Sequence, residues 1–236
     1  MPVSHKQAVY LAAMGIERWV SRASTDIPSS HADARSVTST MPTSEPVVMD
    51  WDALRQQVMT CTQCALHETR TQAVFGVGNP HAELLIIGEA PGADEDRLGE
   101  PFVGRAGQLL NEMLRAVGLS REAVYIANIL KCRPPNNRDP KPEEAAACVG
   151  YLYRQIDLIK PKLILALGRI AAQRLLQTDT PLGRLRQQQH VLAQTQTPLI
   201  VTYHPAYLLR SPLDKRKAWQ DLLFVQKTIK SDQTAT

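Results

Sequence analysis

The sequence predicts an α/β protein, a three-layer sandwich in which helices flank a central four-stranded parallel sheet. Two observations lead to this fold class. Short apolar runs of strand length recur along the chain as ELLIIG, VYIANIL, LILALG and PLIVTY. Segments with the spacing of amphipathic helices separate these runs. Strands that alternate with helices imply right-handed crossovers, and such crossovers join parallel strands.

The expected elements follow one another simply along the chain. A helix is expected over residues 51–59, with Asp52 in its first turn, and an irregular loop over 70–80 leads to the first strand. A helix over 104–117 ends at Gly118, because glycine readily adopts the backbone conformation that closes a helix. The remaining expected segments are helices over 142–159, 169–177 and 214–230 and a weaker extended or hairpin insertion over 183–193.

Composition limits the class of protein. The chain has 236 residues, of which 44% are hydrophobic, enough for one packed domain. A net charge of +4 permits nucleic-acid binding without requiring it, and an aromatic content of 5% argues against a protein that stacks many bases. No stretch approaches the ~18 apolar residues of a membrane span. We therefore expect a cytoplasmic monomer with no membrane association.

Composition also divides the chain into parts. Residues 1–20 carry a short amphipathic helical pattern, which is either a frayed end or a peptide that binds a partner. Residues 21–47 are rich in Ser, Thr, Pro and Asp and contain almost nothing to bury, which predicts a disordered linker. The folded domain is expected over residues 48–230, followed by a tail over 231–236.

The chain is organised around the stretch GEAPGADEDRLGEPFVGRAGQLLN, which follows the apolar run ELLIIG. Ligand sites of parallel α/β sheets form at the carboxyl ends of the strands. Glu89 is the first residue past this strand, Glu95 follows closely, and Pro91 and Gly92 predict a tight turn. Phe102 lies in a Gly-rich loop, where its ring either faces a ligand or simply anchors a surface loop.

Two more polar side chains follow predicted strands. Asn128 comes at the end of the second strand, and His204 comes directly after the last one. Because parallel strands end at one edge of a sheet, both side chains and Glu89 are expected to lie close together. A single histidine in this position is either a catalytic group or a polar residue satisfied by its neighbours.

All four cysteines fall into two groups. Cys61 and Cys64 form a C-x2-C pair at a helix end, and Cys132 and Cys148 lie far along the chain. A cytoplasmic protein favours metal binding over disulfides. The spacing is compatible with a structural zinc site, with an iron–sulfur cluster, or with unrelated buried thiols.

Several motifs together resemble one protein family. GEAPG, then ED, then PFVGRAGQLL is similar to the first motif of the family 4 uracil-DNA glycosylases, and HPAYLLR is similar to the second. NILKCRPPNNR and the cysteine arrangement also match, so the resemblance covers residue 60 to about residue 225. It implies an enzyme that flips uracil out of DNA and hydrolyses its N-glycosidic bond in base excision repair. It also implies a [4Fe–4S] cluster held by Cys61, Cys64, Cys132 and Cys148.

The resemblance and the chemistry suggest roles for the site residues. Breaking the bond leaves positive charge on the sugar and negative charge on the base, chiefly at O2. A neutral His204 can donate a hydrogen bond to O2, and a carboxylate at Glu89 or Glu95 can stabilise the sugar cation or orient water. Asn128 can pair with uracil N3–H and O4, and Phe102 can stack on the flipped ring.

Other residues are assigned more weakly. Ala90 belongs to the substrate-binding turn, at the position where family 1 enzymes have an aspartate, so the group that positions water is either Glu89 or Glu95. Asn137 is a second polar candidate for the base. The residues expected to contact DNA are Leu208 and Leu209, as exposed apolar wedges or as buried core residues, and Arg210.

A second, short resemblance lies near the N-terminus. LAAMGIERW is similar to the N-terminal segment by which the psi subunit of bacterial DNA polymerase III holds the chi subunit, which implies a replication partner bound through residues 5–20. A DNA-repair enzyme of this kind is expected at the bacterial nucleoid. The alternatives are a non-catalytic iron–sulfur protein that binds nucleic acid in replication and a zinc-stabilised nucleotide-processing enzyme.

Overall fold

The computed structural model describes residues 50–233. The expected helix within residues 1–20 and the expected linker over 21–47 lie outside the described residues. The closing helix, expected to end at residue 230, continues to Gln233 and so takes up half of the predicted tail. Within the described residues, no helix is both long enough and apolar enough to cross a membrane.

The protein contains one six-stranded sheet with the strand order β1-β3-β2-β4-β6-β5. The four central strands are parallel, as predicted, and β1 and β5 add antiparallel edges. The predicted four-stranded sheet included neither edge strand, although β5 lies in the segment expected to be an extended or hairpin insertion. The strands are β1 (Val77–Gly78), β2 (Leu84–Gly88), β3 (Tyr125–Asn128), β4 (Leu163–Leu167), β5 (Gln189–Leu192) and β6 (Thr197–Thr202).

The two missed strands lack the apolar signal of the others. β1 is two residues long and lies inside the segment expected to be an irregular loop. β5 lies inside the expected insertion and pairs with β6 beyond it, and most of the β5 residues are exposed or half-buried. An edge strand needs only one neighbour and can expose one face, so its sequence need not be apolar.

Helices form the outer layers of the sandwich. The expected helices over 51–59 and 142–159 are found with those bounds, and those over 104–117 and 169–177 differ by one residue at their ends. Ala93–Leu98, for which no element was predicted, is helical. The helices are α2 (Trp51–Met59), α3 (Leu66–Thr69), α4 (Ala93–Leu98), α5 (Arg105–Ala116), α6 (Pro142–Ile159), α7 (Arg169–Leu176), α8 (Leu182–Leu185), α9 (Pro205–Arg210) and α10 (Lys215–Gln233), with short 3-10 turns η1 (Arg121–Ala123), η2 (Pro135–Asn137) and η3 (Pro212–Asp214).

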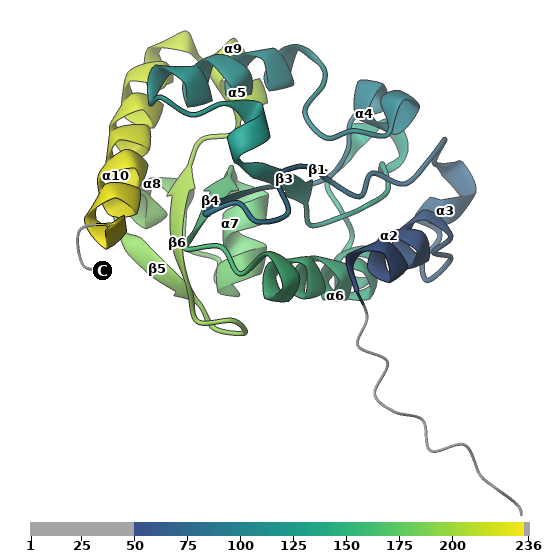
Figure 1. Ribbon diagram of the computed structural model, residues 1–236. Coiled ribbons are helices and arrows are strands. Elements are labelled where there is room, and N and C mark those ends of the chain that lie inside the picture. The colour runs from purple at the N-terminus through teal and green to yellow at the C-terminus, as the bar shows by residue number, and fades with distance from the viewer. Residues whose placement is uncertain (1–49, 234–236) are drawn as a thin grey trace, which may run out of the picture. The chain divides into compact units, whose positions relative to one another are not determined.

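The sheet is buried on both faces. Successive strand residues point to opposite faces, so Leu85 and Ile87 of β2 pack in the layer with α6 and α7. Leu84 and Ile86 of the same strand pack against α5 and α10. Figure 1 shows these helix pairs on opposite sides of the sheet. Burial on both faces explains why the central strands are continuous apolar runs.

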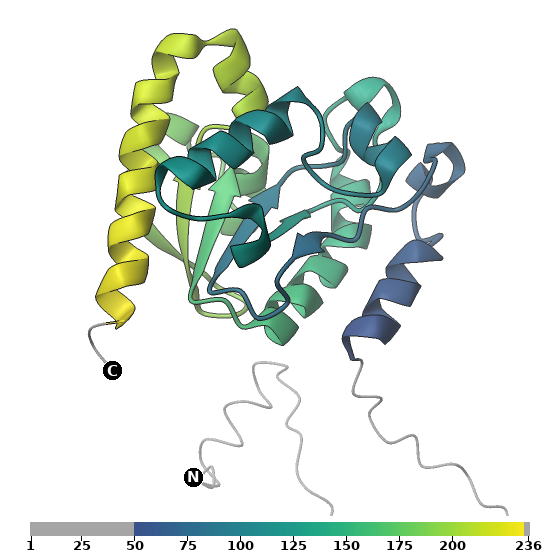
Figure 2. The same ribbon diagram turned by 45° about the horizontal axis from the view of Figure 1, so that its top comes forward.

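The order of the central strands places the site. The chain leaves β2 toward β3 on one side and returns to β4 on the other, so the loops that follow these strands diverge. The arrowheads of the central strands point to one edge of the sheet (Figure 2). Glu89, Asn128, Gly168 and His204 are all found at this edge.

One buried ion pair joins the residue that follows α8 to the closing helix α10. Arg186 and Asp221 are almost fully buried, with side-chain distances of 2.7 and 2.9 Å from the guanidinium nitrogens to the two carboxylate oxygens. The hydroxyl of Thr202, at the end of β6, donates to the same carboxylate at 2.7 Å. Removing one member of such a pair leaves an uncompensated buried charge, which typically costs about 3–5 kcal/mol. The hydrogen bond from Thr202 therefore attaches the end of β6 to α10 through this buried carboxylate.

Candidate functional site

One cavity of about 460 Å³ lies at the carboxyl edge of the sheet. Its volume is within the range of small-molecule sites. The structure brings most of the predicted site residues into its wall. Those residues are Glu89, Ala90, Glu95, Phe102, Asn128, Asn137, His204 and Arg210.

Glu89 follows β2 and is half-buried in the cavity wall. Its backbone carbonyl accepts a hydrogen bond from the Leu130 N–H at 3.0 Å, which fixes the start of the loop. The pKa of Glu89 is raised to about 7, chiefly by burial and also by the charge of Asp139, against an opposing effect of the Arg169 guanidinium. A carboxyl with this pKa can exchange a proton near neutral pH.

His204 begins α9 as its N-terminal cap. The backbone N–H of Ala206 donates to its Nδ1 at 3.1 Å, so the neutral ring carries its proton on Nε2. The pKa of His204 is lowered to about 4, chiefly by burial and also by the nearby charge of Arg210. The ring is therefore uncharged at neutral pH and offers a fixed N–H donor to the cavity.

Asn128 ends β3 and is 2% exposed. Its side-chain Oδ1 is buried and has no hydrogen-bond partner among the described residues. An orphaned buried acceptor of this kind costs ~1–3 kcal/mol. Gly88 lies so close that a Cβ there would come within 2.3 Å of this oxygen. The amide is thus held ready for a ligand that donates a hydrogen bond.

Phe102 faces the cavity in a constrained backbone conformation. Its φ of 55° lies in the left-handed region, where non-glycine residues are strained. The guanidinium of Arg121 donates to the carbonyl oxygens of Phe102 and Pro101, which holds this conformation. The Phe102 and His204 rings lie 5.5 Å apart between centroids. Arg121 was not predicted, because no local pattern marks a contact made across nineteen residues.

The Glu95 carboxylate is occupied by the backbone. One oxygen accepts from the N–H of Val103 at 3.1 Å and of Gly104 at 3.3 Å, and the other accepts from the Gly92 N–H at 3.1 Å. These bonds tie the turn after β2 to the loop that carries Phe102. The arrangement favours a loop-positioning role for Glu95 and leaves Glu89 as the carboxylate with free oxygens in the cavity.

The weaker candidates lie at the rim. Ala90 is half-buried beside the turn. Asn137 is exposed with a φ of 53°, and its Oδ1 accepts from Arg133 Nε at 2.8 Å. Asparagine tolerates the left-handed conformation, so the structure gives Asn137 a turn-forming role in addition to its place in the cavity wall.

The two leucines expected near DNA are placed differently. Leu208 is 1% exposed and packs in the core between the sheet, α5 and α10, so the alternative of exposure is wrong for this residue. Leu209 is 36% exposed, and Arg210 is exposed and lines the cavity. Tyr207, which the sequence analysis did not select, is exposed beside them. The six-residue helix α9 turns Leu208 inward and its neighbours outward.

The four cysteines line one small cavity between α3, α6 and the loop after β3. None forms a disulfide. Cys132 Sγ lies 2.9 Å from a guanidinium nitrogen of Arg70, and Cys148 Sγ accepts from the Lys131 N–H at 3.2 Å. Four sulfurs with cationic and N–H donors fit the chemistry of a thiolate-bound iron–sulfur group. In the described residues no three His, Cys, Asp or Glu side chains are grouped as ligands of a single metal ion.

Lys131 joins the cysteine cavity to the main site. It is 1% exposed, and its Nζ donates to the carbonyl of Asn128 at 2.9 Å and to Gln155 Oε1 at 2.6 Å. Burial lowers the pKa of Lys131 to about 8. Lys131 was not among the predicted site residues, although a lysine directly after the apolar run VYIANIL is an available signal.

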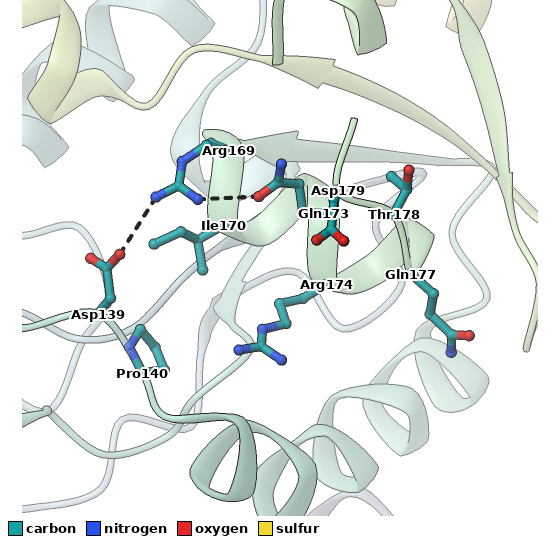
Figure 3. Close-up of a pocket in the computed structure, with 9 residues that line it drawn as sticks. All are labelled: Asp139, Pro140, Arg169, Ile170, Gln173, Arg174, Gln177, Thr178 and Asp179. Carbon is teal, nitrogen blue, oxygen red and sulfur yellow. Dashed lines mark hydrogen bonds and ion pairs between the residues drawn. The ribbon is translucent and has the colours of Figure 1, made fainter. Parts of the chain in front are cut away.

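A second hollow of about 530 Å³ adjoins the site, and Asp139 lines both. Figure 3 shows Arg169 extending from the start of α7 toward Asp139, at 3.5 Å, and toward Gln173. The wall of this hollow includes two arginines and two aspartates, so it has no net preference for an anion. Asn128 and His204, which line the first cavity, do not line this hollow.

Sequence comparisons with known proteins point to one family. The sequence model of the Uracil DNA glycosylase superfamily matches residues 75–223. A type-4 uracil-DNA glycosylase of Archaeoglobus fulgidus is 48% identical over 167 residues, which cover 68% of this chain and 84% of the relative. Type-4 uracil-DNA glycosylases of Pyrobaculum aerophilum and Thermotoga maritima are each 44% identical, over 74% and 68% of this chain and 92% and 83% of their own lengths. The chain therefore belongs to the type-4 uracil-DNA glycosylases of the uracil-DNA glycosylase superfamily.

Proposed function

We propose that this chain is a monofunctional uracil-DNA glycosylase, which flips uracil out of DNA and hydrolyses its N-glycosidic bond to leave an abasic site. The observation that carries the proposal is the buried, unpartnered Oδ1 of Asn128. Uracil N3–H supplies the missing donor, and the amide nitrogen can donate to uracil O4. The names of the type-4 relatives support the same activity.

His204 serves the leaving group. As the bond to N1 breaks, negative charge develops on uracil, chiefly at O2. A neutral imidazole with its proton on Nε2 stabilises that charge by a hydrogen bond and needs no prior protonation. Phe102, held in place by Arg121, stacks on the flipped ring.

Glu89 serves the sugar and the water. With a pKa near 7, its carboxylate can accept a proton from the attacking water and oppose the positive charge on the sugar. Glu95 holds Phe102 and the turn containing Ala90 against one another. We assign the water-positioning role to Glu89 and the loop-positioning role to Glu95.

Cys61, Cys64, Cys132 and Cys148 hold a [4Fe–4S] cluster in this proposal. Each thiolate of such a cluster binds a different iron atom, so its ligands need not converge as the ligands of one ion do. When bound, the cluster supplies a covalent connection between the N-terminal helices and the loop after β3. Lys131 donates its backbone N–H to Cys148 and its ammonium to the Asn128 carbonyl, so this connection also supports the base-reading residue.

The base-reading role predicts the effect of Asn128→Asp. The variant loses both amide donors and places acceptors against O4, so the single-turnover rate of uracil excision should fall by roughly tenfold to hundredfold. Residual release of cytosine should fall less, because cytosine has an amino donor at N4. The measurement uses uracil- and cytosine-containing oligonucleotides followed by alkaline cleavage of abasic sites.

Asn79→Asp is the matched control for this experiment. Asn79 is exposed, accepts a hydrogen bond from the His81 N–H and does not line the cavity, so its substitution should leave both rates unchanged. An unchanged uracil-to-cytosine ratio in Asn128→Asp would show that Asn128 does not read the base.

The raised pKa of Glu89 predicts a pH profile. The carboxylate form of Glu89 is the active form in this proposal. The single-turnover rate of uracil excision at subsaturating enzyme should therefore rise about tenfold per pH unit toward pH 7 and level off above it. His204, with a pKa near 4, stays neutral across this range. Glu89→Gln should be slow and should lack the inflection, which a pH series of single-turnover reactions would record.

Two charged neighbours of Glu89 shift its pKa in opposite directions and so provide controls. Asp139 raises the pKa of Glu89, so Asp139→Asn should move the inflection to lower pH. Arg169 lowers that pKa, so Arg169→Gln should move it to higher pH. An inflection that survives in Glu89→Gln would assign the titration to another group.

The cysteine assignment predicts the metal content. Protein purified without air should be yellow-brown and contain about four iron atoms per chain. Cys132→Ser should lose most of the iron and the colour, as measured by absorbance and elemental analysis. A colourless anaerobic preparation with zinc and no iron would contradict the assignment.

We also propose that residues 5–20 bind the chi subunit of DNA polymerase III. The support is the short sequence resemblance of LAAMGIERW, which lies outside the described residues. Residues 1–45 precede every site residue, so their deletion should leave excision of uracil from short DNA nearly unchanged. The same deletion should abolish capture of the protein by immobilised chi subunit. Equal capture of both forms would remove this partner.

A further inference from the structure

We infer that Tyr207 is a stacking platform for the nucleobase that neighbours uracil on the same DNA strand. The inference rests on the proposed function and adds a second base-binding position to it. Tyr207 lines the same cavity as His204 and Asn128. It is 36% exposed, whereas the adjacent Leu208 is buried.

Tyr207 stacks on Tyr203, and Tyr203 also contacts a guanidinium; these three side chains are called the stack. Its ring lies nearly parallel to that of Tyr203, with an interplanar angle of 15° and 5.2 Å between centroids. The guanidinium of Arg186 lies 4.5 Å from the centroid of the Tyr203 ring. Tyr203 therefore covers one side of Tyr207, and the exposed surface of Tyr207 is not that side.

The stack rests on the buried ion pair. Asp221 accepts two bonds from Arg186, and Arg186 also donates to the backbone carbonyl of Lys217 at 2.7 Å. The outer end is fixed as well, because the Tyr207 hydroxyl donates to Asp214 at 2.6 Å. Asp214 in turn lies 2.8 Å from the ammonium of Lys217. Both ends of the stack are thus attached to the segment that begins α10.

This support exceeds what a surface tyrosine needs. A ring that is already ordered loses little conformational entropy when it binds a ligand, so its stacking energy is retained. By contrast, Phe75 and Tyr125, which pack edge-on against the half-buried Trp51, are both buried. A partly exposed, rigid ring at the rim of a base-binding cavity suits a second planar base.

The position along α9 matches a DNA strand. Tyr207 follows His204 by three residues, and Arg210 follows Tyr207 by three more, so the side chains lie one turn apart. Arg210 is exposed and lines the cavity, where its charge suits a phosphate. Uracil at His204, a phosphate at Arg210 and a neighbouring base on Tyr207 form a continuous set of contacts.

The test measures uracil excision by several protein variants on several DNA substrates, so that the effect of removing a base can be compared between variants. Single-stranded oligonucleotides carry one uracil with ordinary neighbours, with a base-free tetrahydrofuran residue on the 5′ side, or with one on the 3′ side. The proteins are the parent, Tyr207→Leu, Tyr207→Phe and Tyr153→Leu. Tyr153 is a half-buried tyrosine of α6 that does not line the cavity, so Tyr153→Leu controls for loss of a tyrosine ring. Excision is measured as kcat/KM, with thermal unfolding as a check of folding.

The parent and Tyr153→Leu should lose about tenfold in kcat/KM when the base on one side is removed, and the side that matters identifies the stacked neighbour. Tyr207→Leu should be about tenfold slower on the ordinary substrate and insensitive to that removal. Tyr207→Phe should keep most of the sensitivity. Intrinsic effects of the base-free residue cancel in the comparison between proteins.

The possible failures are distinct. A parent that cleaves uracil while Tyr207→Leu shows the same sensitivity to both base removals would overturn the stacking platform alone. A loss of rate in Tyr207→Leu that is equal on all three substrates would assign Tyr207 a structural role and also overturn it. A parent that leaves every uracil intact would overturn the proposed function itself.

Discussion

The burial of both faces of the central parallel strands is the constraint on which the rest of this structure depends. Leu85, Ile86 and Ile87 of β2 are all inaccessible to solvent, so that strand can carry no functional polar side chain along its buried length. Polar chemistry is confined to the residues at which strands end. Because β2, β3, β4 and β6 are parallel, their carboxyl ends share one edge of the sheet. Glu89, Asn128 and His204 are brought together at this edge, in the wall of one cavity.

Desolvation at that edge then sets the state of each group. It raises the pKa of Glu89, lowers that of His204 and leaves the Asn128 oxygen without a partner. The three effects have one cause, which is the removal of water from a cavity built against an apolar sheet. A site that cost less to fold would be more polar and would hold a carboxylate and an imidazole closer to their ordinary pKa values.

The loops that complete the site are held by polar contacts rather than by a core of their own. Glu95 and Arg121 bind backbone groups around Phe102, and Lys131 binds the carbonyl of Asn128. Each side chain fixes a backbone position that the sheet alone would leave free. The buried pair of Arg186 and Asp221 does the same at the end of β6, where Thr202 precedes the His204 loop. Polar groups removed from water are costly to leave unpaired, and once paired they hold the site loops in one defined conformation.

The sequence by itself determined the fold class, the four central strands, the principal helices and the family. Apolar runs and helical spacing are local patterns. Glu89 and His204 could be selected because each directly follows such a run, and Asn128 because it is a polar residue near the end of one. The tertiary structure decided what depends on contacts between distant segments. It turned Leu208 into the core and Tyr207 outward, occupied Glu95 with backbone N–H groups, and paired β1 and β5 with neighbours that their own residues do not specify. Burial and hydrogen-bond partners arise only when the chain is packed, so no local pattern could assign them.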